Sequence, residues 1–247
     1  MTSPSIAVIV PAHNEADYLP ACLDAIDAAS ECYDGLVQTV VVCNRCTDAT
    51  PRIAVERGAK VVSDESRCLA TIRNVGVAAS DAEVIVTCDS DSRLHAETLR
   101  LVAAALSDCA VGGGVDVRFD RRSLGIRATE LFLDQIVRLS GVPCGAFWTT
   151  REAFDAVGGF DESLPMGEDL DFGKRLQRWG RERSLDYRRL AGAPLLTSAR
   201  KFDVYGDWSF FRMMLFDAFR IRRAMRGIDT EFVDEYLYDF NDRPRSE

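Results

Sequence analysis

Two aspartates that could hold a metal lie one residue apart, Asp89 and Asp91, directly after the apolar run EVIVTC and on either side of Ser90. Carboxylates at positions i and i+2 after a buried strand project from one turn, close enough to share a hard cation such as Mn²⁺ or Mg²⁺. Such a cation would bridge to diphosphate oxygens and neutralise the charge on a departing nucleotide. A simple turn that caps the next helix is the alternative.

A second group of carboxylates lies in the segment GEDLDF, residues 167–172. A carboxylate that opens a helix at the mouth of a site can act as a general base and take the proton of a bound hydroxyl group. Glu168, Asp169 and Asp171 would also stabilise a helix N-terminus by electrostatics alone. Both interpretations place a helix directly after Gly167.

The elements that must position these residues follow from hydrophobic patterning. Unbroken apolar runs predict parallel strands buried on both faces, at residues 6–10, 36–42, 59–62 and 83–88. Amphipathic segments between and after them predict helices, which run from Glu15 with Asn14 as the N-cap, over about 48–57, over about 66–79 and over 95–107.

This β-α-β alternation predicts an α/β fold, a doubly wound and mostly parallel sheet whose ligands bind at the carboxyl ends of the strands. Three polar clusters follow three of these strands and should converge on one crevice. They are PAHNE at 11–15, CNRCTD at 43–48 and DSD at 89–91.

Beyond residue 110 the alternation breaks. The sequence predicts a strand over 110–119, a helix over 123–139, an apolar turn over 141–148, a short helix after Thr150 and a helix over 169–179. Gly112–Gly114 fits a closely packed strand better than a phosphate loop. We expect one domain over 1–247, with a nucleotide-binding half (about 1–110), an acceptor and catalytic half (about 111–205), and a C-terminal amphipathic helix and tail (about 206–247).

Composition narrows the classes of function. The net charge of −9 over 247 residues argues against nucleic-acid binding, which needs a basic footprint. The eight cysteines include a lone CxxC, and they predict neither a zinc site nor a disulfide framework, which favours a reducing compartment.

The N-terminal segment lacks the basic start of a signal peptide, and no apolar run reaches the roughly 20 residues of a membrane span. We therefore expect a cytoplasmic location.

The segment 207–226 combines large apolar residues with five arginines. A helix of this composition could lie on anionic lipid at the inner face of a membrane. Packing on its own domain or on the partner in a homodimer is the alternative. The last residues, 241–247, are expected to fray.

Five short motifs in order give the chain a resemblance to the family 2 glycosyltransferases, which have the GT-A fold. They are PAHNE, NRCTDAT, IRNVG, the strand-end DSD and GEDLDF. The resemblance covers about residues 5–200. It implies transfer of a sugar, of the hexosyl type, from a nucleotide-diphosphate sugar with a divalent metal, Mn²⁺ or Mg²⁺.

The resemblance also implies roles for single residues around the donor. Pro11, His13 and Glu15 would border the nucleobase and ribose. Asn44, where many members carry aspartate, and Asp48 would contact the base or position its loop. Arg73 would lie near the diphosphate, where the alternative is an arginine on a helix surface. Asp89, Ser90 and Asp91 would hold the sugar nucleotide and its metal, with Asp91 as the more direct ligand.

For the acceptor side, the resemblance implies that Asp169 is the base and that Glu168 positions the acceptor. Gly145 and Trp148 would line the donor-sugar and acceptor pocket, although core packing is the alternative for Trp148. Arg200 and Lys201 would close over the diphosphate, or form a solvated turn.

The resemblance implies an inverting transfer. The activity is expected to be nonprocessive, because Gln177, Arg178 and Trp179 lack the QxxRW spacing of processive synthases. The acceptor would be a lipid-linked molecule or a small metabolite with a free hydroxyl. Two other functions remain open at this stage. One is a nucleotide-sugar-binding protein without catalysis, and the other is a sugar-nucleotide pyrophosphorylase, which would need a glycine-rich loop where this chain has PAHNE.

Overall fold

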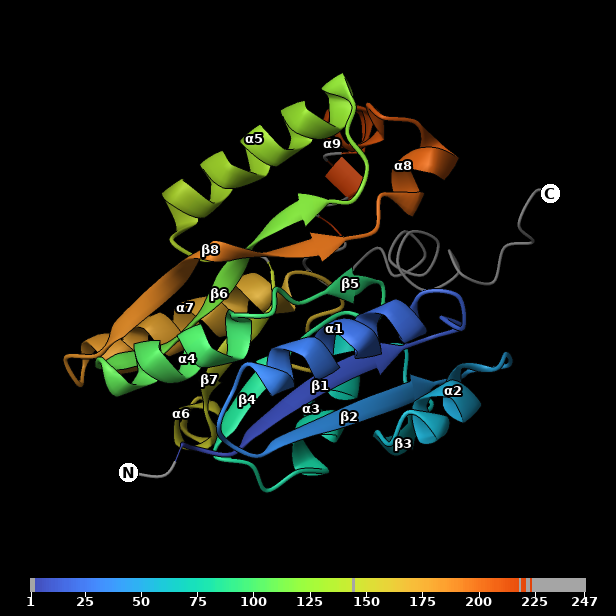
Figure 1. The fold of residues 1–247 in the computed structure, drawn as a ribbon. Coiled ribbons are helices and arrows are strands. Elements are labelled where there is room, and N and C mark those ends of the chain that lie inside the picture. The colour runs from blue at the N-terminus through green and yellow to red at the C-terminus, as the bar shows by residue number, and fades with distance from the viewer. Residues whose placement is uncertain (1–2, 144, 218, 221–222, 224–247) are drawn as a thin grey trace.

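The computed structural model describes residues 3–143, 145–217, 219–220 and 223. Its strands form one sheet in the order β3-β2-β1-β4-β7-β6-β8-β5 (Figure 1). The strands are β1 (Ile6–Ala12), β2 (Val37–Asn44), β3 (Lys60–Asp64), β4 (Val84–Thr87), β5 (Ser92–Arg93), β6 (Ala110–Phe119), β7 (Phe147–Thr150) and β8 (Asp186–Thr197).

The predicted mostly parallel sheet is confirmed. β1 pairs in parallel with β2 and β4, and β2 pairs in parallel with β3. β6 and β8 are also parallel to each other. The exceptions are β7, which is antiparallel to β4 and β6, and β5, which is antiparallel to β8.

Helices cover both faces of this sheet (Figure 1). They are α1 (Leu19–Glu31), α2 (Thr50–Glu56), α3 (Leu69–Ala78), α4 (Thr98–Ser107), α5 (Leu124–Ser140), α6 (Arg151–Ala156), α7 (Glu168–Arg181), α8 (Arg200–Tyr205) and α9 (Ser209–Phe216). Alternate residues of β1 face opposite sides, because side chains alternate along a strand. Ile6 and Val8 pack in the cluster that contains α1 and α4, and Ala7 and Ile9 pack in the cluster that contains α3, α6 and α7. Burial on both faces explains the unbroken apolar runs.

The start of the first helix differs from the prediction. α1 begins at Leu19, with a proline in its first turn, and Asn14 does not cap it. Asn14 instead has a φ of +52°, and its side-chain oxygen accepts a hydrogen bond from the backbone N–H of Thr47 at 2.8 Å. Asparagine tolerates this left-handed conformation, so the residue joins the turns after β1 and β2.

The prediction of a turn over the apolar segment 141–148 is wrong at its end, because Phe147 begins the strand β7 (Phe147–Thr150). β7 lies between β4 and β6, and its Trp148 is only 1% exposed. The glycine run forms part of β6 as predicted. A Cβ atom on Gly113 would overlap the carbonyl oxygen of Arg188 in β8, so close strand packing explains this glycine.

The helices α5, α8 and α9 lie together beyond β6 and β8 (Figure 1). They share a small cluster in which Ile126, Ala199 and Phe202 are buried and Phe119 and Phe210 pack against them. Of the helix expected over 207–226, the structure describes α9; positions 218, 221–222 and 224–226 lie outside the described residues, as does the tail 241–247. Within the described part of the chain, no helix has the length and apolarity to cross a bilayer.

Candidate active site

The side chains predicted for the donor meet at the carboxyl ends of β1, β2 and β4. Glu15 follows β1, and Asp89 and Asp91 follow β4. Parallel neighbouring strands end at the same edge of a sheet, so turns distant in sequence become neighbours there. β5 then pairs Ser92 with Thr197 of β8, and the hydroxyl groups of these two residues lie 2.9 Å apart. This pairing brings the start of α8 to the same edge.

A buried arginine joins the two predicted groups of carboxylates. Arg73 of α3 is 4% exposed. Its Nη1 donates to Asp169 Oδ1 at 2.5 Å and to Glu168 Oε1 at 3.2 Å, and its Nη2 donates to Asp89 Oδ1 at 3.3 Å. The side chain that the resemblance places near the diphosphate thus bridges the predicted donor turn and the predicted base.

The start of α7 fixes this arrangement. Gly167 precedes the helix with a φ of +87°, a conformation that glycine adopts without steric cost. The chain turns there, and Glu168 and Asp169 both reach Arg73. The helix-capping explanation accounts for acidic residues in this first turn. It does not account for the contacts with a buried arginine 95 and 96 residues away.

The electrostatics around Arg73 alter its partners. The pKa of Asp169 is raised from 3.8 to about 7, mainly by burial; the negative charges of Glu168 and Asp89 contribute to this rise, and the positive charge of Arg73 opposes it. The side chain of Asp169 is still 31% exposed, so it lies below the protein surface but open to solvent. The pKa of Arg73 is raised despite its burial, because three carboxylates surround it. Asp169 is therefore a carboxylate with the basicity of a proton acceptor near neutral pH.

A second arginine lies on the other side of the DSD turn. Arg200, at the start of α8, donates to both carboxylate oxygens of Glu15, at 2.7 and 2.5 Å, and to Asp91 Oδ2 at 3.1 Å. Its guanidinium also lies 4.4 Å from the ring centre of Tyr18. The bidentate contact with Glu15 fixes the plane of the guanidinium. The resemblance implies a place for Glu15 near the nucleobase, and the sequence does not predict its pairing with Arg200.

Charged side chains of both signs lie near Asp91 and change its pKa in opposite directions. Burial raises the pKa of Asp91, and Asp89 adds to that rise, while Arg200 and Lys201 oppose it. Burial also lowers the pKa of Lys201, which the carboxylates Asp91, Asp89 and Glu15 partly offset. Lys201 and Arg200 therefore contribute positive charge beside Asp91, where the resemblance expects a diphosphate.

The polar residues after β2 mostly hold the loop in place. Asn44 is 1% exposed, and its amide donates to Asp64 and Ser66 at the end of β3, at 2.8 to 3.0 Å. Asp48 accepts from the backbone N–H of Ala16 and also from that of Thr50. Asn44 and Asp48, which the resemblance places at the nucleobase, thus have hydrogen-bond partners within the protein. The carboxylate of Asp64 was not predicted, since a single acidic residue at a strand end carries no local signal.

His13 lies beside this loop. Its Nδ1 is 2.7 Å from the carbonyl oxygen of Asn44, and the side chain is partly exposed. Pro11 and Ser90 are buried instead, Pro11 within β1 and Ser90 with 5% exposure. The side chains of these two residues are therefore not on the surface of the site.

The two residues predicted for the sugar pocket are packed inside the protein. Trp148 belongs to the hydrophobic core together with Val86 of β4 and Val115 of β6. With 1% exposure its ring is out of reach of a sugar, so the core interpretation replaces the pocket one. Gly145 lies against Val115, where a Cβ atom would come within 2.5 Å of the carbonyl oxygen. Close packing accounts for this glycine.

A further link was not predicted, although one of its ends lies in the motif IRNVG. Asn74, next to Arg73 in IRNVG, donates to the carbonyl oxygen of Phe160 at 2.8 Å and accepts from the N–H of Phe160 at 3.0 Å. Phe160 is part of the segment GGFD, residues 158–161, and Arg73 lies over its ring at 5.2 Å. These contacts tie α3 to the loop that leads to α7.

The donor set at the DSD turn fits a hard divalent cation. Asp89 and Asp91 offer carboxylate oxygens from one turn, the ligands that Mg²⁺ and Mn²⁺ prefer. The site contains three cationic side chains, those of Arg73, Arg200 and Lys201. Five carboxylates lie around them, so negative charge is in excess when all these groups are ionised. Across the described ranges, His, Cys, Asp and Glu side chains form no complete set of three or more metal ligands. Donor oxygens and water would have to complete the shell.

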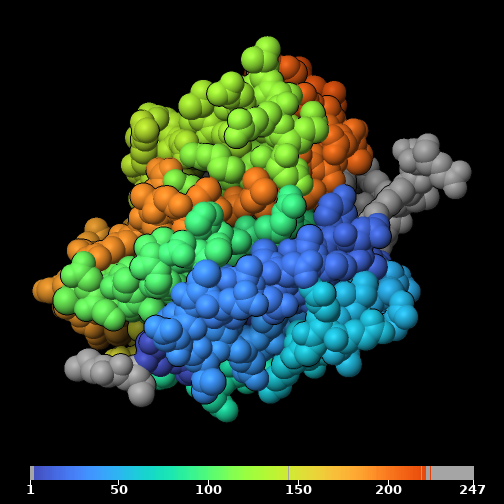
Figure 2. Space-filling model, in the orientation of Figure 1, coloured from blue at the N-terminus to red at the C-terminus, as the bar shows by residue number. Residues whose placement is uncertain are grey.

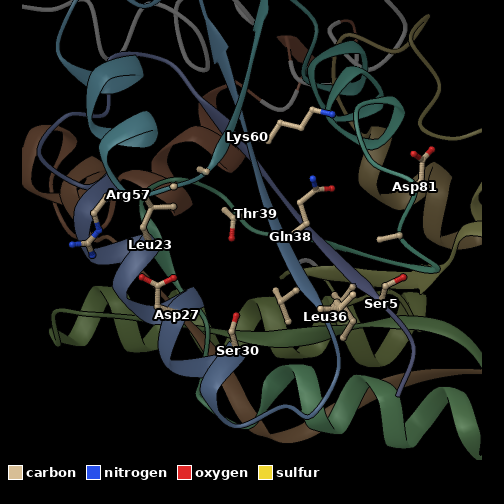
Figure 3. A pocket seen from close by; sticks show the side chains of 15 residues that line it. Ser5, Leu23, Asp27, Ser30, Leu36, Gln38, Thr39, Arg57, Lys60 and Asp81 are labelled. Carbon is tan, nitrogen blue, oxygen red and sulfur yellow. The ribbon is translucent and has the colours of Figure 1, made fainter. Parts of the chain in front are cut away.

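A separate hollow of about 820 Å³ lies elsewhere (Figure 3). It is lined by Leu36 and Gln38 at the start of β2, Lys60 at the start of β3 and Asp27 of α1. These are the amino ends of the parallel strands, opposite to the edge that carries the DSD turn. The hollow is therefore not part of the candidate active site.

Comparison with known proteins identifies the family. The model of the family described as "Glycosyl transferase family 2" matches residues 7–158, a range that contains β1 to β4 and the DSD turn. The chain belongs to this family. A curated family relative, the glycosyltransferase AglE of Haloferax volcanii, is 24% identical over 189 residues, which are 70% of this chain and 62% of AglE.

Solved structures agree on the fold. The structure of TarS 1–349 of S. aureus in complex with UDP-GlcNAc has a TM-score of 0.61 and 19% identity, over 79% of this chain and 59% of that one. The mannosyltransferase PcManGT of Pyrobaculum calidifontis, in complex with GDP-Man and Mn²⁺, has a TM-score of 0.58 and 20% identity, over 96% and 71%. The fold is that of the GT-A glycosyltransferases. The chain spans less than two thirds of the length of AglE and of this TarS chain.

Proposed function

We propose that this chain is an inverting, nonprocessive glycosyltransferase that moves a sugar from a nucleotide-diphosphate sugar to an acceptor hydroxyl. The contact of one guanidinium, that of Arg73, with both Asp89 and Asp169 supports this most strongly. A donor-binding carboxylate and a base must face the same anomeric carbon, and here they lie within the span of a single side chain. The related structures hold donors of this class, UDP-GlcNAc in TarS and GDP-Man in PcManGT.

On the donor side, Asp89 and Asp91 would hold the Mn²⁺ or Mg²⁺ through which the sugar nucleotide binds. The cation, when bound, supplies positive charge to the diphosphate as it leaves. Arg200 and Lys201 lie beside Asp91 and add charge of the same sign. Arginine is well suited to phosphate oxygens because it can donate two parallel hydrogen bonds.

On the acceptor side, Asp169 accepts the proton of the acceptor hydroxyl. The acceptor oxygen forms its bond to the anomeric carbon while the bond from that carbon to the diphosphate oxygen breaks, and the diphosphate leaves with the electron pair. Attack from the face opposite the leaving group inverts the configuration. A base with a pKa of about 7 is mostly ionised just above neutral pH and still basic enough to accept the proton. Glu168, which also contacts Arg73, positions the acceptor.

The test separates the base from the donor site. Asp169→Asn should lower sugar transfer, or the slow hydrolysis of the donor with Mn²⁺, by about 10²-fold or more, and should leave the affinity for the nucleoside diphosphate unchanged in calorimetry. Asp171→Asn is the matched control, since Asp171 lies two residues along the same helix and pairs with Arg175 at 2.6 Å. Full turnover by Asp169→Asn would reject the base.

The wider proposal has its own test. A thermal-shift panel of UDP, GDP and dTDP with Mn²⁺ and Mg²⁺ should stabilise the protein with at least one pair, because a ligand that binds only the folded state raises its stability. Binding without donor turnover in any assay would instead support a nucleotide-sugar-binding protein without catalysis. No stabilisation by any pair would reject the proposed function.

A further inference from the structure

The outer faces of α5 and α9 expose large apolar side chains. In α5, Leu124, Leu131 and Leu139 are 80, 71 and 83% exposed. In and after α9, Leu215, Phe216 and Phe219 are 74, 75 and 71% exposed. We call these six residues the α5/α9 surface; α5 forms the top of the molecule in Figure 2. Single exposed apolar residues are ordinary, but a cluster of them marks a site of interaction.

Ring contacts make this surface continuous. Phe132 of α5 lies with its ring centre 5.6 Å from that of Phe210 and 5.9 Å from that of Phe211 in α9. Trp208, just before α9, is 55% exposed and 5.8 Å from Phe211. The two helices therefore contact each other through aromatic rings, and their exposed apolar side chains lie on neighbouring elements.

The exposed charged side chains of α5 and α9 are arginines. Arg127 and Arg138 are exposed on α5, and Arg212 is exposed on α9. The carboxylates of α5 point inward instead. Glu130 accepts from the backbone N–H of Phe119, and Asp134 accepts from two arginines of β6 and β8. The outward face of α5 thus carries apolar side chains and arginines.

The sequence counts agree with this asymmetry. Residues 119–141 and 202–223, which leave out Arg200 and Lys201 of the candidate active site, together hold eight Arg or Lys and six Asp or Glu, a net charge of +2, in a chain whose net charge is −9. Apolar side chains rimmed by arginine are the composition of helices that lie in the interface of an anionic bilayer. Trp208 adds the aromatic side chain that prefers this interface.

We propose that the α5/α9 surface docks on an anionic lipid bilayer. A symmetric dimer would place the same patch against itself, and so arginines against arginines, which is unfavourable. An acidic membrane surface complements both the apolar area and the charge. α8 begins at Arg200, which contacts Glu15 and Asp91, so docking would hold the candidate active site close to the lipid surface. The proposal does not depend on the sugar transfer proposed above.

The experiment is flotation of the full chain with vesicles of phosphatidylcholine alone or mixed with phosphatidylglycerol. Binding is expected with the anionic vesicles, weakened by added salt. The double variant Leu131→Glu/Leu139→Glu should lower the bound fraction at least about tenfold. Leu36→Glu is the matched control, because Leu36 is 81% exposed at the other end of the sheet.

Charge is tested separately from apolar contact. Arg127→Gln/Arg138→Gln should weaken binding to anionic vesicles by about tenfold or more, whereas Arg52→Gln in α2, whose side chain is 73% exposed, should leave it unchanged. Absence of binding to anionic vesicles would overturn the proposal. Equal binding by the Leu131→Glu/Leu139→Glu variant would overturn it as well. A concentration-dependent dimer that this variant makes monomeric would identify a second copy as the occupant.

Discussion

Replacing Arg73 by methionine should destabilise the protein, and more so at high pH than at low pH. Arg73 is buried and donates to Asp169, Glu168 and Asp89. Methionine fills similar space without charge, so three carboxylates would then face one another. Removal of one partner from a buried ion pair costs about 3–5 kcal/mol. Since Asp169 and Asp89 are 31 and 54% exposed, solvent reduces this, and we expect about 2–3 kcal/mol at about pH 8.5.

The pH dependence follows from the pKa of Asp169. That pKa is raised from 3.8 to about 7 in the folded protein, and Arg73 acts to lower it, so its removal raises the pKa further. A group whose pKa is raised on folding stabilises the folded state below its unfolded pKa and loses this contribution as pH rises through the folded pKa. The penalty of Arg73→Met should therefore shrink to about 1 kcal/mol near pH 5, where protonation relieves the repulsion.

Urea unfolding followed by tryptophan fluorescence at both pH values measures this difference, with Trp148 in the core as the natural reporter. Arg73→Lys keeps the positive charge but loses the forked guanidinium, which can donate to several carboxylates. It should therefore recover part of the stability that Arg73→Met loses at high pH. Arg52→Met, which breaks an exposed pair with Glu56, should change the free energy of unfolding by less than about 0.5 kcal/mol at either pH. A penalty of Arg73→Met that is equal at both pH values would refute the electrostatic account.

Three further predictions concern the core and the site. Trp148→Ala should cost about 3–5 kcal/mol in thermal or urea unfolding, because the ring is fully buried; a loss below 1 kcal/mol, roughly the value for a surface position, would contradict its place in the core. Transfer measured as kcat/KM should fall as pH drops below about 7, because Asp169 must be ionised to accept a proton; a flat profile down to about pH 5 would argue against this base. Asp91→Asn should weaken Mn²⁺-dependent binding of the nucleoside diphosphate by at least about tenfold in calorimetry, and unchanged binding would remove Asp91 from the proposed metal site.

The first half of the fold was predictable because it follows from local patterns. β1 and β2 are buried on both faces, so their apolar runs stand out, and Pro51 and Gly58 mark the two ends of α2. β7 was missed because a strand of four residues next to a glycine turn has no period of its own. β5 was missed because its two residues are fixed by a partner strand about 100 residues later.

The site was predictable to the level of motifs but not of contacts. The positions of Asp89, Asp91 and Asp169 follow from strand and helix ends. The side chains that hold them do not, since Arg200 and Glu15 are 185 residues apart. Asn44 illustrates why contacts do not follow from a motif. A polar side chain at a strand end can point to a ligand or to the next strand, and the side chain of Asn44 donates to Asp64 and Ser66.

The two arginines also connect the site to the integrity of the fold. Arg73 joins α3 to the start of α7, and Arg200 joins the end of β8 to the loop after β1. Each link joins two segments that the strand pairing of the sheet does not hold together. In each, an arginine neutralises carboxylates that would otherwise repel one another at a crowded edge. The same cations that would prepare the edge for a diphosphate therefore hold the C-terminal segments against the first strands. Substitutions at Arg73 or Arg200 should then lower stability and ligand affinity together, whereas Asp169→Asn, which removes one negative charge from this excess, should spare stability.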